Sequence, residues 1–229
     1  MAIVKKYKTE LIAIDNIGNN VFTLEFKSNS GKFKYLPGQF LHLALDEFDP
    51  SEGWPESRCF SIQTSPEQEN IKITYSVKGA FTSRMSQELK IGKILDLKLP
   101  FGELFQNNHS KENTVFIAGG TGMTPFLSLF TDTSFKDYIL PVLYFGYRDE
   151  SQDVYNQDFA KAEAINSSLK IIKQNQENSG FLNIETIWNQ NPTASCFFIS
   201  GPQLMIKNFK AFLLSKGLNQ HQIITDDWE

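Results

Sequence analysis

The sequence predicts a two-domain protein in which an antiparallel β-barrel is followed by an α/β domain with a parallel sheet. The chain has 229 residues, which is enough for two domains of ordinary size. Residues 21–27 alternate between polar and apolar side chains, as a half-buried strand does. After about residue 108, near-continuous apolar runs alternate with helical segments. That alternation is typical of a parallel sheet covered on both faces.

The first half is expected to hold short strands, because apolar stretches there are bounded by turn-forming residues. Many short strands of this kind favour a small antiparallel barrel. One short helix, at about residues 83–89, should interrupt the barrel. The expected strands are residues 21–27, 39–45, 58–62, 71–77 and 94–99.

The second half is expected to hold buried strands with helices between them. The clearest helix is residues 202–216, where Leu204, Phe209 and Leu213 recur at helical spacing and Gly217 supplies a stop. The cleft between two such domains is a common place for a ligand. The expected strands are residues 114–118, 139–145, 169–173 and 196–200.

The overall charge and the cysteine count exclude several classes of protein. A net charge of −4 argues against a general nucleic-acid binder. Two cysteines, Cys59 and Cys196, are too few for a four-cysteine iron–sulfur or zinc site, and no metal-ligand spacing appears. The charged start, the low cysteine count and the lack of an apolar run of about 20 residues predict a cytoplasmic protein without membrane insertion.

The sharpest local motif is residues 118–125, AGGTGMTP, which follows the first strand of the second half and opens a helix. Small residues let the backbone approach a pyrophosphate, and the N–H groups at a helix start favour anions. Pro125 suits a first helical turn. It also stands where a G-x-G-x-x-G fingerprint has its third glycine, and no Lys-Ser/Thr pair marks a P-loop. The plain alternative is a strand–helix turn that needs glycine for close packing.

Two further segments in the first half could bind phosphate. Residues 78–83, KGAFTS, join a strand to a helix that Thr82 or Ser83 could cap. A tight turn with a helix cap explains this segment equally well. Residues 58–61, RCFS, begin a strand with Arg58, whose guanidinium matches phosphate geometry. A solvated charge is the usual alternative for such an arginine.

In this order, the three segments resemble the ferredoxin–NADP⁺ reductase family of flavoproteins, in a stand-alone form without an iron–sulfur domain. Arg58, Phe60 and Ser61 match its Arg-x-Tyr/Phe-Ser signature, and Gly79 and Thr82 match its Gly-x-x-Ser/Thr element. The resemblance runs from about residue 36 to the C-terminus. It implies a flavin-binding barrel at residues 1–108 and a Rossmann-like NAD(P)-binding domain at residues 109–229. The other similar segments are residues 37–40, 100–102, 120–125, 146–148 and 200–205.

The resemblance also implies a role for each matching residue. Arg58 would bind a flavin phosphate, Phe60 would pack against the isoalloxazine, and Ser61 would hydrogen-bond near the flavin N5, where hydride arrives. The remaining residues of the implied flavin site are Cys59, Tyr75, Val77, Gly79, Ala80, Phe81 and Thr82. The residues implied to hold the nicotinamide dinucleotide are Gly120, Thr121, Gly122, Pro125, Gly201, Pro202 and Met205.

Two positions depart from the family pattern. Ser200 stands beside the implied nicotinamide site, where many members have cysteine. The chain ends DDWE rather than Glu-x-Phe/Tyr, and Trp228 either covers the flavin or anchors the chain end. With Ser61, these two residues complete the set of candidate catalytic side chains.

The implied function is electron transfer between NAD(P)H and a separate acceptor, with FAD favoured over FMN. The acceptor would be ferredoxin, flavodoxin, an oxygenase component or free flavin. Lys5, Lys6 and Lys8 could attract an acidic carrier, although a solvated strand end explains them more simply. Residues 173–175 are candidates for binding a 2′-phosphate, yet no Ser-Arg pair decides between NADPH and NADH. The alternatives are a flavin-binding regulatory subunit without free turnover and a ligand-free interaction module.

Overall fold

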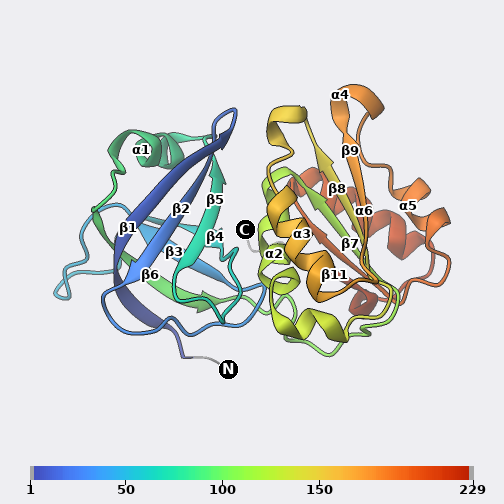
Figure 1. Ribbon diagram of the computed structural model, residues 1–229, viewed down its shortest axis with the longest axis horizontal. Coiled ribbons are helices and arrows are strands. Elements are labelled where there is room, and N and C mark those ends of the chain that lie inside the picture. Colours follow the sequence, from blue (N-terminus) through green and yellow to red (C-terminus); the bar gives the residue numbers. More distant parts are fainter. Residues whose placement is uncertain (1–2, 227–229) are drawn as a thin grey trace.

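The computed structural model describes residues 3–226 and consists of two packed domains, each built on one sheet (Figure 1). The first sheet has six strands in the order β4-β3-β6-β1-β2-β5, and every hydrogen-bonded pair in it is antiparallel. One helix, α1 (Ala80–Glu88), lies at one end of this sheet. The strands are β1 (Lys5–Gly18), β2 (Val21–Ser28), β3 (Phe40–Ala44), β4 (Ser57–Ser61), β5 (Ile71–Ser76) and β6 (Ile94–Phe101).

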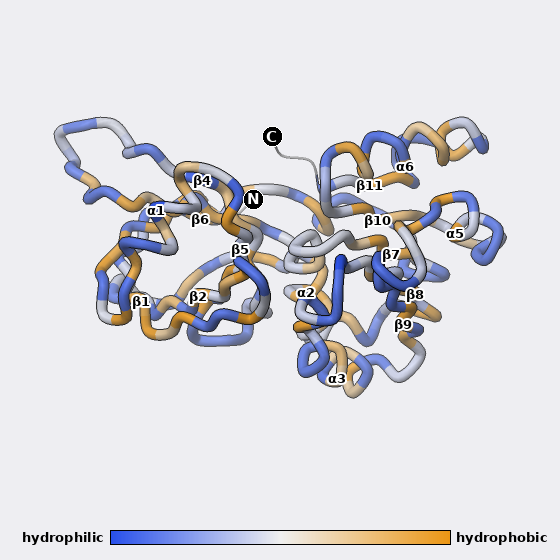
Figure 2. Tube along the Cα trace, turned by 90° about the horizontal axis from the view of Figure 1, so that it is seen from above, coloured by the Kyte–Doolittle hydropathy of each residue, from blue (hydrophilic) through white to orange (hydrophobic). Residues whose placement is uncertain are grey.

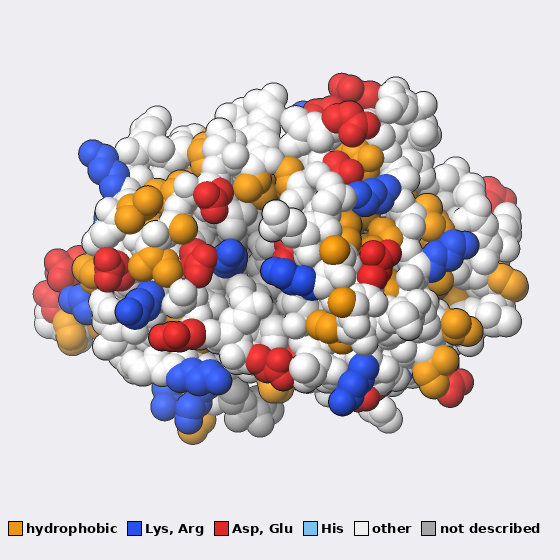
Figure 3. All heavy atoms as spheres, in the orientation of Figure 1, with side chains coloured by type: hydrophobic (Ala, Val, Ile, Leu, Met, Phe, Trp, Pro, Cys, Tyr) orange, Lys and Arg blue, Asp and Glu red, His pale blue; other side chains and the backbone are white. Residues whose placement is uncertain are grey.

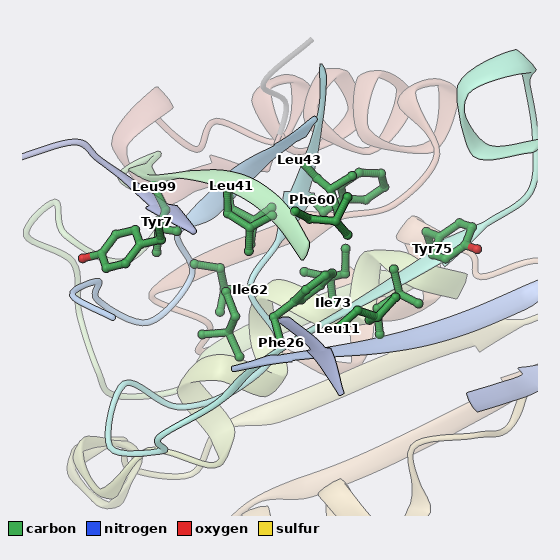
Figure 4. Close-up of a cluster of buried hydrophobic side chains, with 14 of the residues drawn as sticks. Tyr7, Leu11, Phe26, Leu41, Leu43, Phe60, Ile62, Ile73, Tyr75 and Leu99 are labelled. Carbon is green, nitrogen blue, oxygen red and sulfur yellow. The ribbon is translucent and has the colours of Figure 1, made fainter. Parts of the chain in front are cut away.

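The first sheet curls around one apolar core, so that its two edge strands, β4 and β5, approach each other. Phe60 of β4 meets Tyr75 of β5 at a ring-centre distance of 6.2 Å. Just beyond β4, the Gln63 amide donates to the Lys72 carbonyl in β5 over 2.8 Å. Figure 4 shows the core side chains pointing toward one another from all sides of the barrel. The predicted antiparallel barrel is therefore confirmed.

The second sheet has five parallel strands in the order β11-β10-β7-β8-β9. Helices cover both faces, since one apolar cluster joins the sheet to α2 and α3 and another joins it to α5 and α6. The predicted parallel α/β domain is confirmed. Its strands are β7 (Thr114–Gly119), β8 (Val142–Tyr147), β9 (Lys170–Asn175), β10 (Cys196–Ser200) and β11 (Ile223–Thr225). Its α-helices are α2 (Thr124–Phe130), α3 (Asn156–Ile165), α4 (Gln176–Ser179), α5 (Ile184–Gln190) and α6 (Gln203–Ser215). Its 3₁₀ turns are η1 (Gly120–Met123), η2 (Thr133–Asp137), η3 (Glu150–Gln152) and η4 (Gln220–Gln222).

The strand order places a switch point at β7. From β7 the chain proceeds outward through β8 and β9, and it then returns to the other side of β7 for β10. The loops that follow β7 and β10 therefore leave the sheet in different directions. In open parallel sheets, this divergence makes a crevice at the carboxyl ends of the strands, where ligands bind.

The sequence patterns missed the longest strand. No strand is expected before residue 21, yet β1 runs for 14 residues and joins β2 to β6. Its side chains do alternate, because Tyr7, Thr9 and Leu11 are buried while Lys6 and Lys8 are exposed. The lysines make the start of β1 look like a solvated segment in the sequence, although they alternate with three buried residues.

Buried hydrogen bonds fasten the two domains together. Helix α2 lies between the barrel and its own sheet (Figure 2). From α2, the Ser128 hydroxyl donates to the Thr64 carbonyl over 2.7 Å. From the barrel, the Ser65 hydroxyl donates to the Asp132 carboxylate over 2.9 Å. Ser65 and Ser128 are 1% and 0% exposed, so losing either partner would leave a buried polar group at a cost of about 1–3 kcal/mol.

A third polar contact across the interface involves an ionisable group. The Gln63 side-chain amide donates to the Asp158 carboxylate over 3.4 Å. Burial raises the pKa of Asp158 above its usual value, and the charges of Lys161 and Lys72 and the Gln63 hydrogen bond offset only part of this.

No helix among residues 3–226 is long and apolar enough to cross a bilayer.

The raised pKa of Asp158 predicts a pH-dependent stability difference for Asp158→Asn. A carboxyl whose pKa is higher in the folded state contributes stability at acidic pH and loses that contribution as the pH rises through its unfolded and then its folded pKa. The Tm of the variant relative to the parent should therefore rise between pH 4 and pH 7, as measured by differential scanning calorimetry. Glu163→Gln, on the exposed side of the same helix, should show no such trend. A Tm difference for Asp158→Asn that stays constant or falls over this range would contradict the assignment.

Candidate functional site

Arg58 lies beside the start of α1. Its guanidinium carbon is 5.0 Å from the ring centre of Phe81, the second residue of that helix. Its terminal nitrogen forms an ion pair with Glu56 at 2.9 Å, and the two side chains are 52% and 56% exposed. A pair this exposed contributes about 0–1 kcal/mol. A phosphate could therefore compete with Glu56 for the guanidinium.

The start of α1 offers backbone donors to an anion. The first helical hydrogen bond runs from the Ser83 amide to the Gly79 carbonyl, so the amides of Ala80, Phe81 and Thr82 lack acceptors within the helix. These N–H groups and the helix dipole attract negative charge. A Cβ atom built on Gly79 meets nothing within 4 Å, so the approach to this helix end is open.

The expectation that Thr82 or Ser83 caps α1 is wrong. The N-cap is Gly79, in extended backbone conformation, and Thr82 occupies the third helical position. The Thr82 hydroxyl oxygen accepts from the amides of Lys78 and Gly79, at 2.9 and 3.1 Å, and the hydroxyl donates to the Gly79 carbonyl. The helix consequently begins three residues earlier than predicted, and Thr82 braces the turn from inside it.

Phe60 and Tyr75 form the wall where β4 and β5 meet. They are 8% and 3% exposed, and Tyr75 also stacks on Phe22 at 5.5 Å. Burial raises the pKa of Tyr75 to about 12, so its hydroxyl keeps its proton at neutral pH. Ser61 is buried at the end of β4, and Val77, just after β5, is half-buried against the same core. Phe60, Tyr75 and Val77 thus share the barrel core, where the Phe60 and Tyr75 rings make an edge-to-face contact.

The glycine-rich segment after β7 forms the 3₁₀ turn η1 and then α2, and Pro125 lies in the first turn of α2 as expected. Gly120 has a φ of +55°, which favours glycine. A Cβ built on Gly122 would lie 2.5 Å from the backbone N and Cα of Gly201. Close packing of two loops thus requires glycine at residue 122. Small residues of both loops therefore meet at the carboxyl end of β7.

The loop after β10 packs against the same end of β7. Met205 and Pro202 lie against Gly119, since a Cβ built there would be 3.2 Å from the Met205 sulfur and 2.9 Å from the Pro202 ring. Ser200 is 2% exposed, and its hydroxyl donates to the Asp226 carboxylate over 3.0 Å. Trp228 lies outside the described residues.

The two candidate phosphate sites lie on the same side of the molecule, since η1 packs against β5, the strand that leads into Gly79 and α1. In Figure 1, α1 and α4, which follow the carboxyl ends of β5 and β9, both stand at the upper end. Within residues 3–226, no group of three or more His, Cys, Asp or Glu side chains is arranged to hold a metal ion.

The sequence analysis missed Gln63, a residue that joins the barrel to the second domain. Gln63 accepts a hydrogen bond from Thr74 over 2.6 Å on the barrel side and contacts Asp158 on the other. The only local signal was a short polar run, residues 63–65, directly after an apolar strand. A run of that kind reads as a loop unless the partner domain is already known.

Two protein-family models match the chain. Residues 6–125 match the family model of the FAD-binding domain, and residues 116–210 match that of the oxidoreductase NAD-binding domain. The fold and the two matching family models thus define an FAD- and NAD-binding oxidoreductase. The chain belongs to the FAD-binding domain family, which agrees with the flavin motifs of the sequence.

Individual relatives are distant. The chain is 28% identical over 135 residues to methane monooxygenase component C of Methylosinus trichosporium, covering 56% of this chain and 38% of that protein. It is 23% identical over 186 residues to a flavohemoprotein of Candida norvegensis, covering 80% of this chain and 47% of that protein. The chain therefore spans less than half the length of these two relatives.

Solved structures show the same fold. A ferredoxin NADP⁺ reductase from Neisseria gonorrhoeae with bound FAD and NADP superposes with a TM-score of 0.78 at 18% identity, covering 99% of both chains. An Amycolatopsis cytochrome P450 reductase gives a TM-score of 0.82 at 14% identity, covering 98% of this chain and 70% of the other.

The contact between Gly122 and Gly201 predicts that Gly122→Ala is destabilising. The added methyl group would force two backbone segments apart, which costs about 1–3 kcal/mol in a well-packed site. Urea denaturation should show this loss. Gly53→Ala, where an added Cβ meets nothing within 4 Å, should change stability by no more than about 0.5 kcal/mol. Equal urea midpoints for the two variants would contradict this prediction, because they would show that the loops accommodate a methyl group at residue 122 without loss of stability.

Proposed function

We propose that this protein passes electrons from a reduced nicotinamide dinucleotide to a separate acceptor through FAD. In this proposal residues 1–108 hold the flavin and residues 109–229 hold the dinucleotide. The packing of η1 against β5 carries the proposal, because it puts the nucleotide loop next to the strand that leads to the flavin-phosphate site. Two flat rings held from opposite sides of such a junction can be brought into contact, which is the main requirement of hydride transfer.

The flavin phosphates would be held by Arg58 and the first amides of α1. Two anion-binding groups side by side suit a pyrophosphate better than a single phosphate, which favours FAD over FMN. Cys59, Phe60, Tyr75 and Val77 would shape the flavin pocket. A flavin held by these residues would supply the redox chemistry between a hydride donor and a one-electron acceptor. Ser61 would hydrogen-bond at the edge of the ring. The helix-start residues at this site are Gly79, Ala80, Phe81 and Thr82.

The dinucleotide would be held by the crevice beside β7. Small residues there leave backbone N–H groups accessible to a pyrophosphate. Ser200 gives its hydroxyl proton to Asp226, so its oxygen is left to accept a hydrogen bond from a ligand. The residues that would line this site are Gly120, Thr121, Gly122, Pro125, Gly201, Pro202 and Met205.

The acceptor is proposed to be an oxygenase component, a ferredoxin, a flavodoxin or free flavin. Support for an oxygenase component comes from relatives such as methane monooxygenase component C and the phenol hydroxylase P5 protein of Acinetobacter pittii, which is 27% identical over 160 residues. A lysine patch for an acidic carrier has little support, because Lys6 lies 3.6 Å from the Phe48 ring centre and Lys8 lies 4.0 Å from Glu47.

Steady-state oxidation of NADH or NADPH distinguishes an enzyme from a flavin-binding regulatory subunit. Purified, FAD-loaded protein should oxidise NADH or NADPH in the steady state with ferricyanide as the artificial acceptor. A flavin-loaded protein that shows no such turnover would support the flavin-binding regulatory subunit instead. A colourless protein that takes up no added FAD would support the ligand-free module.

Arg58→Ala tests the flavin-phosphate site. Loss of a charge-assisted hydrogen bond of about 1.4 kcal/mol or more should raise the Kd for FAD at least tenfold, as measured by fluorescence titration of the apoprotein. The matched control is Arg84→Ala on α1, whose guanidinium is bound to Asp46 and Glu88 at 2.8 and 2.9 Å. The control should keep the parent Kd. If Arg58→Ala holds FAD as tightly as the parent, the phosphate role is wrong.

A further inference from the structure

A second contact between the domains lies away from the buried hydrogen bonds, at the tip of the hairpin that joins β1 to β2. This hairpin tip, residues 18–20, stands opposite the turn after β8 at the upper end of the domain junction (Figure 1). Figure 3 shows the atoms of the two domains in contact there, most of them backbone or uncharged. A Cβ atom built on Gly18 would lie 2.6 Å from the carbonyl oxygen of Ser151 in η3. The two backbones therefore meet directly, with no room for a side chain at residue 18.

The barrel fixes the hairpin tip to the strand that leads into the proposed flavin-phosphate site. The Val77 amide donates to the Asn20 carbonyl over 2.9 Å, two residues before Gly79 at the start of α1. Val21, the first residue of β2, pairs with Ser76, the last residue of β5. A shift of the hairpin tip would therefore carry the end of β5 with it.

The turn opposite the hairpin tip is braced within its own domain. The Asp149 carboxylate accepts from the Ser151 amide over 2.9 Å and caps η3. The Asn175 side-chain nitrogen donates to the Glu150 carboxylate over 3.1 Å, which ties η3 to the end of β9. The atom that an added Cβ would strike is a backbone oxygen, which cannot turn aside as the end of a flexible side chain does. A side chain at residue 18 would therefore push the two domains apart.

The hairpin tip and the buried hydrogen bonds hold the domains together at opposite ends of β5. The buried contacts come from residues 63–65 of the barrel. These residues lie beside the start of β5, since the Gln63 amide donates to the Lys72 carbonyl. The hairpin tip lies beside the other end of this six-residue strand, about 17 Å away. A wedge at the hairpin tip would therefore rotate the domains about the buried contacts and open the junction at its upper end.

We infer that Gly18 is a positioning residue, whose missing side chain sets the gap between the domains at the end where the flavin and the nicotinamide dinucleotide would bind. The inference rests on the proposed function, since this gap matters to the reaction only if two rings meet across it. Gly18 itself touches neither ligand and acts through the spacing of the domains alone.

The size of the expected shift is large enough to affect hydride transfer. A Cβ at residue 18 needs about 0.8 Å more room to reach the 3.4 Å at which an ordinary contact begins. Hydride transfer requires the reacting atoms to be about 3–3.5 Å apart, and a misplacement of about 1 Å lowers such a rate by as much as about 100-fold. A single methyl group at this position should therefore slow the reaction measurably.

The test is the limiting rate of flavin reduction, measured by anaerobic stopped flow on FAD-loaded protein with whichever of NADH and NADPH the parent oxidises. Gly18→Ala should lower this rate about tenfold or more, and the bulkier Gly18→Val should lower it further. The long-wavelength absorbance band of a stacked flavin and nicotinamide should weaken in parallel, whereas the Kd for FAD should stay at the parent value. Gly53→Ala, where an added Cβ meets nothing within 4 Å, should keep the parent rate.

Each other outcome overturns a distinct statement. A parent whose flavin is reduced by neither NADH nor NADPH contradicts the proposed function, and this inference fails with it. If the parent is reduced and both Gly18 variants are reduced equally fast, the positioning role is wrong and the proposed function stands. Slower reduction with an undiminished absorbance band also overturns that role, because the rings would still be stacked. Loss of FAD from both variants overturns it too, since a change in spacing alone leaves the flavin site intact.

Discussion

The rest of the structure depends on a buried polar seam that holds two separately built sheets in one orientation. Apolar packing alone would allow the domains to slide, since it has little directional preference. The Ser128–Thr64 and Ser65–Asp132 hydrogen bonds add direction, because both serines are almost fully buried and a lost partner would leave a buried polar group unpaired. The seam thereby fixes where the end of β7 lies relative to β5.

That fixed orientation sets the positions of the two proposed anion-binding ends relative to each other. The start of α1 with Arg58 is the proposed place for a flavin phosphate, and the carboxyl end of β7 is the proposed place for the dinucleotide pyrophosphate. In this proposal the two reactive rings meet between the domains. Few side chains need to take part in the chemistry itself, because positioning of the two rings accounts for most of what such a protein contributes.

The sequence predicted what depends on local pattern and missed what depends on distant partners. The change from short alternating strands to buried runs correctly predicted the two-domain fold. Residues 78–83 and 118–125 predicted two phosphate-binding ends, which stay predictions. The strand β1 was missed because Lys5, Lys6 and Lys8 masked its alternation. The Ser128–Thr64 hydrogen bond joins residues 64 positions apart, and the Asn175–Glu150 hydrogen bond joins residues 25 positions apart. No local sequence pattern could predict such pairs. The roles of the individual site residues stay predictions.

Anaerobic titration of the purified, FAD-loaded protein with NADH, followed through the visible absorbance of the flavin, tests the central claim most directly. If the two domains hold flavin and nicotinamide against each other, stoichiometric NADH will bleach the flavin without any added acceptor. A flavin that remains oxidised in excess NADH and in excess NADPH would show that the rings do not meet, and the account would be wrong.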